Sequence, residues 1–153
     1  MTTLEGVWEY ESFLILPSEA ERAAPPGSPV TARKWAMGAL TVSTDTDEEV
    51  SGELVFAPGI TLNVRGLVLD TSSRLPILTA TGEGVSGPTK GAVYRILGVI
   101  IRDANGQESV QGSVLAVRGP DVNPDVELGG MPINTVGSFV LSAEKKERGR
   151  TRS

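Results

Sequence analysis

Apolar and polar residues alternate along most of this chain, or run in short apolar blocks. A period of two places successive side chains on opposite faces of a β-strand, whereas a helix repeats its apolar positions every three or four residues. Helix evidence is thin, and 18 Gly and 10 Pro interrupt the chain. The pattern therefore predicts an all-β protein with eight strands, at residues 6–16, 35–44, 49–56, 60–69, 75–81, 92–102, 108–117 and 136–143.

Short turn-like connections join several of these segments, at 45–48, 57–59 and 104–106. Asn105-Gly106 is the strongest hairpin signal, because both residues tolerate positive φ. Strands joined by short turns form an antiparallel meander, and eight of them can close into an up-and-down barrel without free edges. We therefore predict a single eight-stranded antiparallel barrel over residues 1–143. A β-sandwich with a filled core is the alternative.

Three long connections, at 17–34, 82–91 and 118–135, fall at the same end of such a meander. One rim of the barrel is therefore expected to carry loops and the mouth of a ligand site. Residues 17–34 contain a proline-rich centre and are predicted to form a lid over that mouth. A cavity of about 300 Å³ or more would support ligand binding, and a filled barrel would exclude it.

The alternation also predicts which side chains face inward. In residues 6–16 one face carries Trp8, Tyr10 and Leu14, and the other carries Glu9 and Glu11, which places the second set outside. A hydrophobic small molecule inside the barrel would contact apolar inward residues and residues near the mouth. The residues predicted to bind it are Trp8, Leu14, Trp35, Met37, Leu54, Phe56, Val64, Ile96, Val114, Met131 and Phe139.

Tyr10 and Tyr94 are the only tyrosines, and the alternation puts both on inward faces. A buried hydroxyl needs a hydrogen-bond partner, and partners are scarce inside an apolar barrel. One interpretation is that each hydroxyl bonds a backbone carbonyl near a barrel end. The other is that at least one donates to a substrate carbonyl, which makes Tyr10 and Tyr94 the predicted catalytic residues.

The chain contains no Cys and no His, which excludes disulfides, thiol nucleophiles, imidazole bases and Cys or His metal sites. We predict no metal and no cofactor. Residues 82–87 spell G-x-G-x-x-G, but Pro88 and a β-rich run follow where a dinucleotide site needs a helix, so a rim loop is expected. Asp121, Asp125 and Glu127 lie in the last long loop, where polar rim residues are ordinary.

The net charge of −5 is unevenly distributed. Residues 144–153 hold five basic and two acidic residues and are expected to form a disordered tail, which leaves 9 basic and 17 acidic residues in 1–143. An acidic body repels phosphate backbones, so no nucleic-acid partner is predicted. No signal-peptide pattern opens the chain, and no apolar run reaches the roughly 18 residues of a membrane span. We therefore predict no membrane association and a cytoplasmic location.

The segment 92–102 is apolar on both faces. Such a strand is expected to be covered on both sides, by a lid or by another subunit. We therefore predict a homodimer.

Gly6-Val7-Trp8 opens the first predicted strand, within the run LEGVWEYESF at residues 4–13. This start resembles the calycin group of β-barrels, and most closely the bacterial lipocalin-like domains. The resemblance implies that Trp8 plugs a closed barrel end and packs under a basic residue from late in the chain, for which Lys145 or Arg118 could serve.

Two classes of function fit these features. The architecture is similar to that of the β-barrel polyketide cyclases, including spirotetronate-type Diels–Alderases and allene-oxide-cyclase-like proteins. This similarity implies a cofactor-independent enzyme that folds a flexible apolar intermediate for cyclisation, for example of the [4+2] type, in which shape and one or two donors supply the catalysis. The alternative is a non-catalytic lipocalin-like carrier or sensor of a hydrophobic molecule, and a purely structural subunit is a third interpretation.

Overall fold

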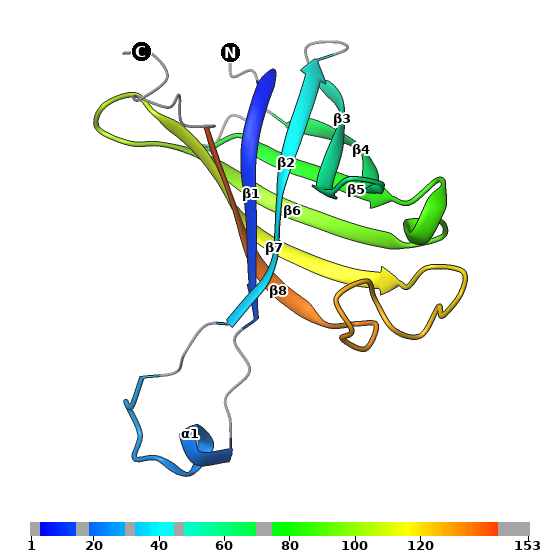
Figure 1. The fold of residues 1–153 in the computed structure, drawn as a ribbon. Coiled ribbons are helices and arrows are strands. Elements are labelled where there is room, and N and C mark those ends of the chain that lie inside the picture. Colours follow the sequence, from blue (N-terminus) through cyan, green and yellow to red (C-terminus); the bar gives the residue numbers. More distant parts are fainter. Residues whose placement is uncertain (1–3, 15–18, 30–32, 45–47, 70–74, 144–153) are drawn as a thin grey trace, which may run out of the picture.

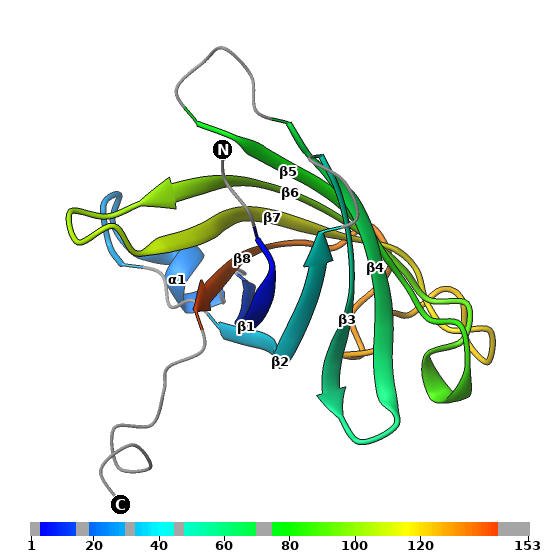
Figure 2. The ribbon, with the colours of Figure 1, turned by 90° about the horizontal axis from the view of Figure 1, so that it is seen from above.

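Eight strands form one closed barrel in a computed structural model that describes residues 4–14, 19–29, 33–44, 48–69 and 75–143. Each strand is antiparallel to its neighbours in the chain, and the last strand pairs with the first (Figures 1 and 2). The predicted all-β, up-and-down barrel is confirmed, and the sandwich alternative is wrong. The strands are β1 (Gly6–Leu14), β2 (Arg33–Thr44), β3 (Glu49–Ala57), β4 (Ile60–Leu69), β5 (Ile77–Glu83), β6 (Val93–Arg102), β7 (Glu108–Arg118) and β8 (Val136–Ala143).

Two short helices lie in the long connections: α1 (Glu19–Ala23) and the 3-10 turn η1 (Gly87–Thr89). No described helix is long and apolar enough to cross a membrane. Figure 1 shows α1 beyond the ends of β1 and β2, and no residue of 19–29 lines the cavity described below. The described part of this connection therefore does not cover the cavity in this structure, and the predicted lid stays a prediction. The predicted basic tail, 144–153, lies outside the described residues.

The inward faces are the ones that the alternation predicts. Glycine makes room for large side chains at one point of the wall, because a Cβ on Gly98 would lie 2.9 Å from the Phe139 ring. Phe139 is fully buried as a result. The buried inward residues of β1, β6 and β7 are Trp8, Tyr10, Ser12, Tyr94, Ile96, Ile100, Val110, Val114 and Ala116.

One barrel end is closed around Trp8. Its indole N–H donates a hydrogen bond of 2.8 Å to the Leu4 carbonyl, and both side chains are buried. The void that remains there is only about 20 Å³. The basic residue expected over Trp8 is not Arg118, which bonds the Gly91 carbonyl and Asp121 at the opposite end. Lys145 lies outside the described residues.

The β6–β7 hairpin forms at the predicted turn, between Arg102 and Glu108. Among the described residues only Gly106 of the pair Asn105-Gly106 has a positive φ, of 83°. The turn is held by Asp103, whose carboxylate accepts hydrogen bonds from the Asn105 and Gln107 N–H groups. An aspartate that bonds the following backbone stabilises a tight turn with one left-handed residue, so Asn105 does not need that conformation.

Candidate functional site

A cavity of about 260 Å³ lies in the barrel end that carries the long connections. The wall is formed where β1, β3 and β5 finish and where β2, β4 and β6 begin, and the β7–β8 connection closes one side. Its volume is below the 300 Å³ that the sequence analysis set as support for ligand binding, but the barrel is hollow at this end rather than filled. The opposite end is packed around Trp8, which gives the barrel one mouth and one floor.

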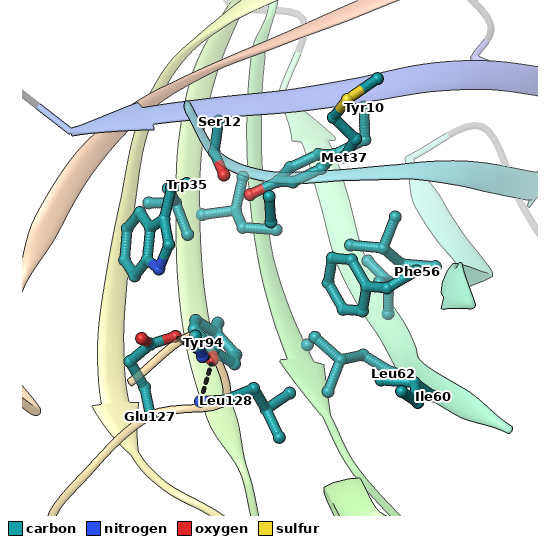
Figure 3. A pocket seen from close by; sticks show the side chains of 17 residues that line it. Tyr10, Ser12, Trp35, Met37, Phe56, Ile60, Leu62, Tyr94, Glu127 and Leu128 are labelled. Carbon is teal, nitrogen blue, oxygen red and sulfur yellow. Dashed lines mark hydrogen bonds between the residues drawn. The ribbon is translucent and has the colours of Figure 1, made fainter. Parts of the chain in front are cut away.

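Nine of the predicted site residues line this cavity (Figure 3). Strand alternation turns most of them inward at the mouth end, whereas Trp35 lies at the register shift between β1 and β2, and Met37 pairs with the outward Glu11 and is 53% exposed at the rim. Whether they bind a substrate stays a prediction. These residues are Tyr10, Trp35, Met37, Leu54, Phe56, Val64, Tyr94, Ile96 and Val114.

The other four predicted residues do not line the cavity. Trp8 belongs to the closed end, and Leu14 lies past the register shift near the end of β1. Phe139 faces inward but stands behind the Tyr10 ring, stacked on it at a centroid distance of 6.1 Å. Met131 lies in the β7–β8 connection and contributes a backbone N–H rather than its side chain. Alternation predicts the face of a residue but not its height in the barrel, which is why Trp8 and Phe139 were included. Met131 was included as a residue near the mouth.

The polar centre of the site is Glu127, whose residue surface is only 4% exposed. Its Oε1 accepts hydrogen bonds from the Tyr94 hydroxyl at 2.8 Å and from the Gly129 N–H at 2.9 Å. Its Oε2 accepts one from the Met131 N–H at 2.7 Å. The Leu128 N–H donates to the Tyr94 oxygen at 3.1 Å (Figure 3). This connection is therefore folded around a buried carboxylate.

The Tyr94 hydroxyl is fully engaged by this network. Burial raises its pKa well above the usual value, and the hydrogen bond to Glu127 and the negative charge of that carboxylate raise the pKa further. One interpretation in the sequence analysis was a backbone carbonyl as partner for each tyrosine. That interpretation is wrong for Tyr94, whose proton points at a carboxylate.

Tyr10 lies on another part of the wall and has a different environment. Figure 3 shows its hydroxyl beside the Ser12 side chain. Burial raises the pKa of Tyr10 to about 12; the Ser12 hydrogen bond opposes this increase, and the charge of Glu127 adds to it. The Phe56 ring meets the Tyr10 ring edge-on at 6.3 Å. Tyr10 is thus a neutral hydroxyl held by aromatic packing at the cavity surface.

Trp35 lies between strand β8 and the β7–β8 connection that carries Glu127. Its six-membered ring lies against Gly137 of β8, where a Cβ would come within 2.7 Å of the ring. Its Nε1 and the Glu127 Oε2 each lie 3.0 Å from where a Cβ on Gly129 would be. The two glycines therefore let the indole sit between β8 and the loop, with its nitrogen on the side of the carboxylate (Figure 3).

Some lining residues were not predicted. Ile60 and Leu62 follow the same alternation as Val64 and could have been found from it. Glu127 sits in an irregular loop, where no periodicity reports burial. The available signal was the pair of glycines after Leu128, which permits a tight loop around one side chain. The lining residues outside the predicted set are Ser12, Ala36, Ile60, Leu62, Gly82, Glu127, Leu128 and Gly129.

The acidic residues of the β7–β8 connection do not converge. Asp121 pairs with Arg118 at 2.8 Å, whereas Glu127 bonds Tyr94. Over the part of the chain that the structure describes, no group of three acidic side chains could hold a metal ion.

Comparisons with protein-family models, with curated proteins and with solved structures gave no match. The strand topology and the cavity assign the protein to the closed eight-stranded antiparallel barrels with an apolar end cavity. This architecture is consistent with a calycin-like barrel.

The two buried tyrosines predict a loss of stability at alkaline pH. An unfolded tyrosine ionises near pH 10, whereas folded Tyr10 keeps its proton until about pH 12. The free energy of unfolding should therefore be unaffected by these groups below pH 10 and fall by about 3 kcal/mol on account of Tyr10 as the pH rises to 12. Urea denaturation at a series of pH values measures this, and Tyr10→Phe should show a shallower decline. Equal slopes for the two proteins would contradict it.

Proposed function

We propose that the barrel binds a hydrophobic small molecule in its end cavity. The observation that carries this proposal is the pairing of an apolar cavity at the mouth end with a packed floor at the other. A barrel that served only as a structural subunit would gain stability from filling that space, since buried voids cost stability. A volume of about 260 Å³ accommodates about a dozen non-hydrogen atoms at ordinary organic packing density.

The two tryptophans allow a direct test, because Trp35 lines the cavity and Trp8 does not. Phenylbutanol, a neutral probe of suitable size, should change the tryptophan fluorescence of a Trp8→Phe variant in a saturable manner. A Trp35→Phe variant, which keeps only the distant indole, should bind with a much smaller change. Absence of saturable binding of this probe by calorimetry to the unaltered protein would count against the proposal.

A cofactor-independent cyclase is the second candidate. The specific observation that favours it is the Tyr10 hydroxyl at the cavity surface, beside the Ser12 side chain. A neutral hydroxyl in an apolar site can donate to a substrate carbonyl and polarise it. A [4+2] closure then converts three carbon–carbon π bonds of one chain into two new σ bonds and one π bond and loses no atoms, so the cavity has only to hold the diene and the polarised alkene together.

We also propose that two copies pair through the outer face of β4, β5 and β6. Leu97 is 57% exposed and Leu67 is 40% exposed, and both lie in register with Thr79 of the strand between them. A second row, formed by Leu69, Ile77 and Val99, runs beside them on the same face. Burying this face in a pair would remove apolar surface from water.

Sedimentation at micromolar concentration is expected to give a dimer, and Leu97→Glu should give a monomer because it would bury a charge at the interface. A 16.1 kDa species for the unaltered protein would contradict the pairing. Dimerisation that survives Leu97→Glu would place the interface elsewhere.

A further inference from the structure

Among the residues that the structure describes, Glu127 is the only acidic one that lines the cavity, and no described Lys or Arg lines it. Within the described ranges no basic side chain lies within ion-pair distance of its carboxylate. All three of its contacts are donors, so its oxygens act only as acceptors, as those of an ionised carboxylate do. This buried carboxylate therefore faces an apolar space with no counter-ion from the described part of the chain.

The field of this carboxylate reaches across the cavity. The charge of Glu127 raises the pKa of Tyr10, which sits on β1, as well as that of its direct partner Tyr94. Charges interact strongly where water is excluded, so the cavity carries a negative potential. The acidic body of the protein, with 17 acidic and 9 basic residues in 1–143, has the same sign.

The rest of the wall also favours a cation. Four aromatic rings line the cavity, from Tyr10, Trp35, Phe56 and Tyr94. The Trp35 and Tyr94 rings meet at 65° with centroids 6.4 Å apart, next to the carboxylate (Figure 3). The faces of aromatic rings attract ammonium groups, most strongly where water is absent.

We propose that the cavity is selective for hydrophobic amines, whose ammonium group lies beside Glu127 and whose apolar part fills the strand-lined space. This inference rests on the proposed function and specifies the class of its ligand. A carboxylate accepts about four hydrogen bonds, and three described donors leave capacity for an ammonium N–H. An anionic ligand of the same shape would be repelled.

Calorimetry with three probes of one shape tests this: phenylbutylamine, which is a cation at neutral pH, phenylbutanol, which is neutral, and phenylbutyrate, which is an anion. The unaltered protein should bind the amine about tenfold or more tightly than the alcohol, and the carboxylate most weakly. An alcohol that binds as tightly as the amine would overturn the amine preference while leaving hydrophobic binding intact. No binding of any probe would overturn the proposed function as well.

Glu127→Gln should bring the ratio of amine to alcohol affinity close to one and leave the alcohol affinity nearly unchanged. Asp125→Asn is the matched control, because it removes the same charge from an exposed position in the same loop and should keep the preference. Tyr94→Phe retains the carboxylate and should also keep it. A preference that survives in a folded Glu127→Gln protein would overturn the assignment to this residue.

Discussion

The Gly82→Phe variant is expected to bind phenylbutanol about 100-fold more weakly than the unaltered protein. Gly82 lines the cavity, and a Cβ there would meet its nearest neighbours, Leu62 and Val64, at 3.5 to 3.9 Å, which are ordinary packing distances. The backbone therefore accepts a side chain that points into the cavity. A phenyl group would fill about half of the space, and excluding half of a ligand this size costs about 3 kcal/mol of apolar contact.

Gly82→Ala is the matched control, because it adds a Cβ to the same backbone and leaves most of the cavity open. Its affinity should stay close to that of the unaltered protein, and both variants should fold with equal or higher stability, since glycine weakens a strand. Calorimetric titration measures affinity, and thermal unfolding measures stability. Undiminished binding by a folded Gly82→Phe protein would show that the ligand lies outside this cavity.

The Tyr10→Phe variant is expected to lower cyclisation about 10- to 1,000-fold if the barrel is catalytic, the range for one hydrogen-bond donor to a developing oxyanion. A decatrienone, with a diene and an enone joined by a short chain, is a suitable probe, and chromatography measures its bicyclic product. The substitution removes only an oxygen whose described partner is Ser12, so the fold should be retained. Phenylbutanol binding should be nearly unchanged, which separates a lost donor from a damaged cavity.

Tyr94→Phe provides the comparison. The Tyr94 proton is directed at Glu127, so it is not free for a substrate carbonyl, and turnover should fall less than in Tyr10→Phe. The stability cost should be larger, about 1–3 kcal/mol, because the Leu128 N–H loses its acceptor and Glu127 loses a donor. Equal turnover by the unaltered protein and both variants would leave shape as the source of any acceleration. Binding without turnover by any of the three would favour a carrier or sensor.

The barrel and the polarity of its wall could be predicted from the sequence, because both depend on local patterns. Alternation in each strand assigns Tyr10, Leu54 and Tyr94 to the inside, and short turns between successive strands make the meander. The placement of long connections at one end follows from strand order alone, and the cavity lies at that end. Alternation carries no information on height, however, so Trp8 and Phe139 were grouped with the cavity residues.

What only the tertiary structure decided is which polar groups meet inside. Glu127 lies 33 residues from Tyr94 in the chain, and their 2.8 Å hydrogen bond depends on how an irregular loop folds back over the barrel end. The periodicity of apolar residues cannot predict such a contact, because the contact depends on the conformation of the loop glycines and on backbone N–H donors elsewhere in the loop. The sequence by itself determined a barrel with an apolar interior. The folded chain alone decided that a buried carboxylate, with no basic partner among the described residues, would face that interior, because the donors that hold it there come together only after folding.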